Sequence, residues 1–221
     1  MSLGLLFSDE FRGFYKSRAM LALWVGLPVT AIVLHSLQPN AEGIPFLFVV
    51  TLLITSLGGI IACVTLSTSI TTETNNHVYD LFLIRPVKRS TLLLAKFFAV
   101  LVCVLVAAAL AFLSGYLLDL WTMGTPPAMM VGETLDSIAL GVAGISIACS
   151  LGVLIGVLVR SVTVSAIGGI YAGGQLSAVI ALVPTLIPDW ISPEVLAATM
   201  CFLVTPLVLL VAIAAFERKQ I

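Results

Sequence analysis

The sequence predicts an all-α polytopic membrane protein with six transmembrane helices. Of its 221 residues, 60% are hydrophobic and only 10% are charged, and the mean hydropathy is +1.19. A soluble domain has about 25% charged residues, so this chain has too few charges to cover a soluble surface. The apolar residues fall into runs of about 20 or more, the length that crosses a bilayer core as a helix. Alternation with a period of two residues is absent, which disfavours a transmembrane barrel.

The six predicted spans are free of acidic residues and contain one basic residue, Lys96. They cover residues 19–37, 45–70, 92–118, 137–159, 162–187 and 195–216. The first run is longer than the apolar core of a signal peptide and lacks a small-residue cleavage site, so we interpret it as a span. The connections after the first, third and fifth spans are short, and we expect one membrane domain over residues 1–221.

The basic residues predict the orientation. Nine of the ten Lys and Arg residues lie before the first span, after the sixth, or in the connections between spans two and three and between spans four and five, and the tenth, Lys96, lies one turn inside the start of the third span. Positive residues concentrate on the cytoplasmic side of membrane proteins. We therefore expect a protein of the cell (plasma) membrane with both termini in the cytoplasm.

Residues 1–18 precede the first span and have helical periodicity. Their apolar side comprises Leu3, Leu6, Phe7, Phe11, Phe14 and Tyr15, and their polar side comprises Ser8, Asp9, Arg12 and Lys16. This pattern is typical of an amphipathic helix that lies in the membrane interface. A plain helical extension of the first span is the alternative.

The segment 71–91 is the longest polar interruption in the chain. Within it, Val78, Leu81, Phe82 and Ile84 can form the apolar side of a short helix that ends before Pro86. Such a helix is a natural docking element for a cytoplasmic partner. A solvated loop whose basic residues only set the topology is the alternative.

A longer pattern runs through this segment. Glu73 and His77 are followed by Asp80-Leu81-Phe82-Leu83, by Arg85-Pro86-Val87-Lys88-Arg89, and by a leucine-rich start of the third span that ends in Lys96. This order resembles the signature of type-2 ABC transporter permeases. His77 stands where that family usually has Gly, and Lys88 where it usually has a small hydroxyl residue.

The resemblance implies a transmembrane permease subunit of an ABC exporter, in which residues 71–91 form a coupling helix that binds a separate ATPase subunit. The implied partner-binding residues are Glu73, His77, Asp80, Arg85, Pro86, Lys88 and Arg89. No Lys in the chain follows a Gly, so the chain has no phosphate-binding Walker A sequence. ATP and Mg would be bound by the partner, and we expect this chain to be non-catalytic, with no cofactor or metal of its own. A second permease copy (homodimer or heterodimer) and membrane lipid are the other expected partners, and nucleic acid is not.

Small residues in the fourth and fifth spans predict close helix packing. Gly144, Gly152 and Gly156 recur at multiples of four residues, and Gly173 and Gly174 directly precede Gln175. These glycines allow close packing within one subunit. Alternatively, the fifth span lines a subunit interface or pathway, in which case Gln175, a side-chain amide deep in a span, is a pathway candidate.

Other classes of function stay open at this stage. An ABC-type membrane subunit could transmit ATPase motion to an extracytoplasmic partner without moving cargo. An intramembrane enzyme is a rival, but the two histidines, His35 and His77, fall on opposite sides of the predicted membrane. An ion-coupled carrier usually needs a carboxylate within a span, and the predicted spans contain none.

Overall fold

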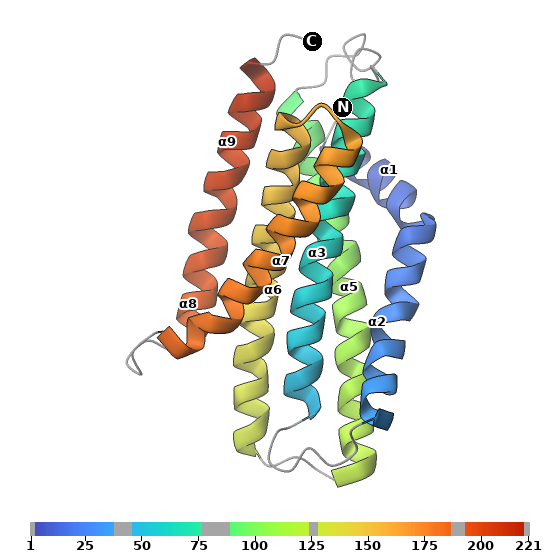
Figure 1. Ribbon diagram of the computed structural model, residues 1–221, viewed down its shortest axis with the longest axis vertical. Coiled ribbons are helices and arrows are strands. Elements are labelled where there is room, and N and C mark those ends of the chain that lie inside the picture. The colour runs from blue at the N-terminus through green and yellow to red at the C-terminus, as the bar shows by residue number, and fades with distance from the viewer. Residues whose placement is uncertain (1–2, 38–45, 77–88, 124–127, 187–192, 219–221) are drawn as a thin grey trace.

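The computed structural model describes residues 3–37, 46–76, 89–123, 128–186 and 193–218 (Figure 1). The described residues form helices and short turns, with no strand among them, so the predicted all-α class is confirmed. The helices are α1 (Leu3–Tyr15), α2 (Arg18–Leu37), α3 (Phe46–Asn75), α5 (Arg89–Met123), α6 (Ala128–Leu158), α7 (Val162–Leu186), α8 (Pro193–Thr199), the π-helix η1 (Met200–Val204) and α9 (Thr205–Arg218).

Over the described residues, four stretches of helix are long and apolar enough to cross a membrane. They are Leu53–Asn75, Ser90–Leu118, Ile138–Leu158 and Val195–Arg218. A fifth is added if α1 and α2, which meet at a bend of 58°, form one broken span. The apolar helix α7 coincides with the fifth span expected from the sequence but is not among these four. The fold is therefore that of a helical membrane protein, and the number of six spans stays a prediction.

Helices extend beyond the apolar runs at several ends. α3 continues to Asn75 and α5 begins at Arg89, so both ends of the segment 71–91 are helical and only 77–88 lies outside the described residues. α6 likewise begins at Ala128, well before the predicted start at residue 137. Hydropathy detects the part of a helix that matches the bilayer, whereas backbone hydrogen bonding continues through polar residues such as Glu133 and Asp136.

α3 is the central helix of the bundle. It packs against α5, α6 and α7, and Figure 1 shows α7 crossing in front of it. Backbones approach closely at two glycines: a Cβ added at Gly152 of α6 would lie 2.7 Å from the Cys63 carbonyl oxygen, and one at Gly173 of α7 would lie 2.7 Å from Ile60 Cα. A side chain at either position would force the helices apart, so these glycines determine how close α6 and α7 come to α3.

Two apolar clusters fill the space around α3. One joins α3, α5, α6 and α9 and takes in α1, through buried residues that include Leu6, Leu66, Ile70, Leu93, Val100, Ile145, Val153 and Phe216. The other joins α2, α3 and α5 through Leu23, Leu27, Ala31, Ile54, Ala107, Ala108 and Ala111. Trp24 adds a polar contact to the second region, since its indole nitrogen donates a hydrogen bond to the Cys103 carbonyl at 3.1 Å.

The predicted sixth span contains a π-helical turn, η1, between α8 and α9. Pro206 follows it closely and has no backbone N–H to donate to the preceding turn, which is a common cause of an irregular helix. Next to this turn, the Ser146 hydroxyl of α6 lies 3.2 Å from the Thr205 hydroxyl and 3.3 Å from Cys201 Sγ. These contacts attach the irregular turn to α6.

Candidate functional site

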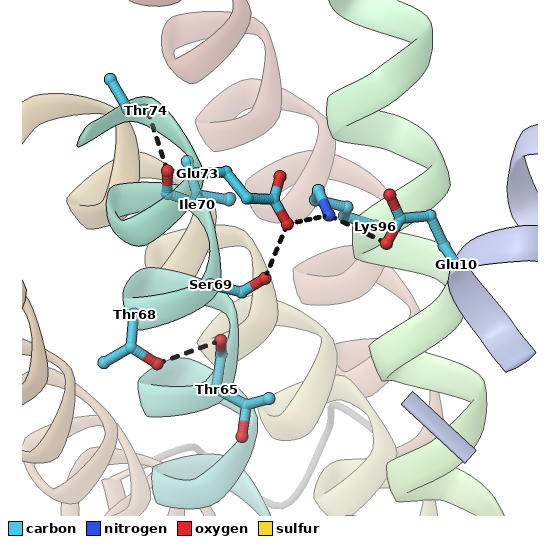
Figure 2. Close-up of polar contacts among 8 residues, drawn as sticks. All are labelled: Glu10, Thr65, Thr68, Ser69, Ile70, Glu73, Thr74 and Lys96. Carbon is cyan, nitrogen blue, oxygen red and sulfur yellow. Dashed lines mark hydrogen bonds and ion pairs between the residues drawn. The ribbon is translucent and has the colours of Figure 1, made fainter. Parts of the chain in front are cut away.

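A buried lysine joins three helices at the end of the bundle where α3 ends and α5 begins. Lys96 of α5 is only 2% exposed, and its Nζ donates hydrogen bonds to Glu73 Oε1 of α3 at 2.6 Å and to Glu10 Oε2 of α1 at 2.8 Å (Figure 2). Ser69, one turn before Glu73, donates a hydrogen bond to the same Glu73 oxygen at 3.3 Å. We call Glu10, Glu73 and Lys96 the ion-pair cluster.

The ion-pair cluster has one more negative than positive charge. The carboxylate side chains are 20% exposed for Glu10 and 25% exposed for Glu73, whereas the ammonium is buried. An unpaired ammonium in such a place would be strongly unfavourable, and the two carboxylates offset that cost. The ring of Phe14 adds a further contact, with its centroid 5.8 Å from Lys96 Nζ.

The sequence of α1 brings Glu10 to Lys96. Leu6, Glu10 and Phe14 are spaced by four residues, so they lie on one side of the helix. Leu6 is buried in the main core, and Phe14 packs against that core. Glu10 lies between them and is therefore directed at α5 with its apolar neighbours.

A second row of residues on α1 is aromatic. The rings of Phe7 and Phe11 stack with centroids 5.8 Å apart, and those of Phe11 and Tyr15 with centroids 6.3 Å apart. Tyr15 meets Trp24 of α2 edge-on at 5.2 Å. Tyr15 thus connects this row to α2, and α1 as a whole packs mainly on α5.

Hydroxyl groups connect the same end of α3 to α6 and α7. Thr71 Oγ1 lies 2.8 Å from the Ser67 carbonyl, 3.2 Å from the Gly156 carbonyl and 3.0 Å from Ser165 Oγ. Ser67 Oγ donates to the Ser165 carbonyl at 3.2 Å. One turn further on, the Asn75 amide donates to the Arg160 carbonyl at 2.8 Å. Other hydroxyls of α3 bond back to their own helix, as those of Thr68 and Thr74 do in Figure 2.

The comparisons with known proteins give a family. Residues 29–203 match the family described as a protein of unknown function, DUF2705. The chain belongs to the DUF2705 family. No curated protein matches it. The part of the chain that matches DUF2705 contains Glu73 and Lys96, whereas Glu10 and the whole of α1 precede it.

Two of the seven predicted partner-binding residues of this DUF2705 protein lie in described helices. Glu73 belongs to α3 and to the ion-pair cluster, and Arg89 is the first residue of α5. The other five lie outside the described residues: His77, Asp80, Arg85, Pro86 and Lys88. Within the described parts of the chain, no group of three or more His, Cys, Asp or Glu residues could hold a metal ion.

The predicted packing and pathway residues divide between the inside and the outside of the bundle. Gly144, Gly152, Gly156 and Gly173 are buried, and Gly174 is half-buried. A Cβ at Gly156 would lie 2.9 Å from the Ser67 carbonyl oxygen, so it packs on α3 as Gly152 does. Gln175 is exposed on the outer side of α7.

Sequence reasoning did not single out Glu10, although the chain contains a signal for it. Glu10 interrupts the apolar row of α1, with Leu6 four residues before it and Phe14 four residues after it. Lys96 is likewise the one charged residue within the predicted spans. A charge on an apolar helix face and an opposite charge in an apolar span each need a partner, so the pair could have been predicted together.

Proposed function

We propose that this DUF2705 protein is the transmembrane permease subunit of an ATP-driven ABC exporter in the cell membrane. In this proposal the chain has six spans, both termini are cytoplasmic, and residues 71–91 receive a separate ATPase subunit that binds ATP and Mg. The proposal combines the resemblance in residues 73–96 with the geometry of the ion-pair cluster.

The ion pair between Glu73 and Lys96 is the observation that carries the proposal. These residues lie on α3 and α5, on either side of the segment 77–88, and their 2.6 Å contact ties the two helices together where that segment joins them. A force on the segment would therefore move α3 and α5 as a pair. Because α3 also packs against α6 and α7, such a movement would reach most of the bundle.

The charges at this end of the bundle support a cytoplasmic location. Arg12, Lys16, Arg160 and Arg218 are exposed. They belong to α1, to the turn after it, to the turn between α6 and α7, and to the end of α9, which lie towards the same end of the molecule in Figure 1. Exposed positive charges at one end of an apolar bundle favour the cytoplasmic side of a membrane.

The outer side of α7 supports a second permease copy. Thr163, Ile167, Tyr171, Gln175 and Val179 are all exposed, and they follow one another at intervals of four residues along one side of the helix. The opposite side carries Gly169 and Gly173, which pack on α3. Lipid tails offer no hydrogen-bond partner to a Gln amide, whereas the same row on a second copy does.

Co-purification from the native host tests the proposal. The tagged protein is isolated in mild detergent, and its companions are identified by mass spectrometry. We expect a roughly stoichiometric ATPase polypeptide, which is lost in the variants Asp80→Lys and Arg85→Glu. Arg160→Glu is the matched control, because it reverses an exposed charge in the connection between α6 and α7.

Glu73 is not a suitable position for this test, because its substitution would disturb the ion-pair cluster as well as any docking surface. Absence of an ATPase, from a host extract in which other ABC complexes remain intact, would contradict the proposal. Retention of the ATPase in Asp80→Lys and Arg85→Glu would contradict the assignment of residues 71–91 as its docking site.

A further inference from the structure

The Lys96 ammonium is bound by more carboxylates than its charge requires. Glu73 Oε1 at 2.6 Å is enough to neutralise it, yet Glu10 Oε2 also lies at 2.8 Å. The second carboxylate adds negative charge to a site that is only partly open to water, with Glu10 20% and Glu73 25% exposed. Two like charges on one partner repel each other, so the fully assembled cluster is less stable than two independent ion pairs would be.

The two carboxylates differ in how firmly their helices are held. Glu73 is on α3, a helix of 30 residues whose Leu66 and Ile70 are fully buried in the main core. Glu10 is on α1, a helix of 13 residues that enters the same core through Leu6, with Phe11 and Phe14 packed against it. Since α1 buries much less apolar surface than α3, it is the helix that separates from α5 at the smaller free-energy cost.

We propose that α1 docks reversibly on α5, and that Glu10 leaves and rejoins Lys96 while Glu73 remains bound to it. When α1 separates, Lys96 keeps one carboxylate and never becomes a buried unpaired charge. Separation also removes the excess negative charge of the cluster. Glu10 thus acts as the releasable contact and Glu73 as the permanent counter-ion. This inference rests on the contacts of α1 alone and holds whether or not an ATPase binds the protein.

The rest of α1 suits a helix with two positions. Asp9, Arg12 and Lys16 are exposed on its polar side when it is docked. The apolar side carries the aromatic row of Phe7, Phe11 and Tyr15. A helix with these two sides is stable in the membrane interface, with its rings in the apolar layer and its charges in the water. The membrane surface therefore provides a place for the released helix.

Hydrogen–deuterium exchange of the full chain in lipid nanodiscs tests this inference. Glu10→Gln should raise the exchange rate of the amides of residues 3–15 about tenfold, the factor that corresponds to about 1.4 kcal/mol, while residues 92–104 of α5 stay unchanged. Asp9→Asn is the matched control, since it removes the same charge from an exposed neighbour on α1 and should leave the exchange rate unchanged.

Glu73→Gln distinguishes a releasable contact from a rigid network. It leaves Glu10 as the sole carboxylate on Lys96, so the exchange rate of residues 3–15 should stay equal to that of the unmodified protein or fall below it. Three results would overturn the inference. The first is an equal exchange rate of residues 3–15 in Glu10→Gln and Asp9→Asn. The second is a rise in that rate in Glu73→Gln as large as the rise in Glu10→Gln. The third is a faster exchange of residues 92–104 in Glu10→Gln, which would show that the whole bundle loosens.

Discussion

The hydroxyl oxygens of Thr71 and Ser165 lie 3.0 Å apart between α3 and α7, and both residues are fully buried. Thr71 is also within hydrogen-bond distance of the Gly156 carbonyl of α6, so one side chain contacts both helices that pack on this face of α3. Thr71 Oγ1 lies still closer, at 2.8 Å, to the Ser67 carbonyl of its own helix. The contacts to Ser165 and Gly156 therefore add to a bond within α3 and connect three helices.

Thr71→Val tests that contact. Valine has nearly the same shape, but it leaves the Ser165 hydroxyl and the Gly156 carbonyl without this partner, so we expect a loss of about 1–3 kcal/mol in the free energy of unfolding. The fraction that remains folded after heating in detergent, followed by size-exclusion chromatography, measures the effect. Thr72→Val is the control, because Thr72 is exposed. Equal stability of the two variants would contradict this interpretation of the hydroxyl contacts.

Gly173→Ala and Gly174→Ala are a second pair of test and control variants. A Cβ at position 173 would lie 2.7 Å from Ile60 Cα, a backbone atom that cannot move aside alone, and at position 174 the nearest atom is Ile60 Cδ1 at 3.9 Å. We expect Gly173→Ala to destabilise the protein by about 1–3 kcal/mol. Gly174→Ala should be neutral, or stabilising by up to about 1 kcal/mol through helix propensity. Thermal unfolding in the same detergent compares the stabilities of the two variants. If Gly174→Ala were the less stable of the two, α7 would not pack on α3 as described.

The charges of the ion-pair cluster predict that substitutions of Glu10 and Glu73 have non-additive effects on the free energy of unfolding. Glu10→Gln and Glu73→Gln each leave Lys96 with one carboxylate, so each should have a small effect on global unfolding. The double variant leaves a buried ammonium without a counter-charge and should lose about 3–5 kcal/mol. Lys96→Met removes the buried charge and should be less harmful than the double variant, because both carboxylates reach water in part. Simple additivity of the two single substitutions would argue against a shared counter-ion.

Trp24 and Trp121, two of the three tryptophans, permit a spectroscopic prediction. Trp24 donates to the Cys103 carbonyl and contacts Tyr15, whereas Trp121 is 87% exposed on the bundle surface. Trp24→Phe should lower the free energy of unfolding by about 1 kcal/mol, since the carbonyl loses its donor. Trp121→Phe should leave stability unchanged. Fluorescence-monitored unfolding measures both variants, because each keeps two of the three tryptophans of the chain as probes. An equal loss of stability in the two variants would count against the Trp24 contact.

The helical class and the positions of most helices were predictable because hydropathy reports directly on burial in lipid. Helix ends were less predictable. Residues 71–75 are polar, and the sequence assigned them to a connection, yet they continue α3 because Thr71, Thr74 and Asn75 find hydrogen-bond partners within α3 and across to α6 and α7. The partners of Thr71 in α6 and of Asn75 at Arg160 are 85 positions away in the sequence, and no local pattern reveals them.

The candidate site was predictable only in part. The pattern that contains Glu73 and Lys96 was recognised as a resemblance and assigned Glu73 to partner docking, which stays a prediction. The contact of the Glu73 carboxylate with Lys96 was not predicted. Glu10 was missed because most residues on its side of α1 are apolar, and that side was interpreted as wholly apolar. Its partner is separated from it by 86 positions in the sequence, and only the fold brings the two together.

Photo-crosslinking in living cells tests the proposed function most directly. A photoreactive amino acid is placed at Lys88, in the segment expected to dock the ATPase, and in a separate variant at Glu42, in the connection expected on the opposite side of the membrane. The account predicts a light-dependent adduct between position 88 and a polypeptide that carries an ATP-binding Walker A sequence, and no such adduct from position 42. An adduct from position 42 alone, or none from position 88 in a membrane-inserted protein, would contradict it.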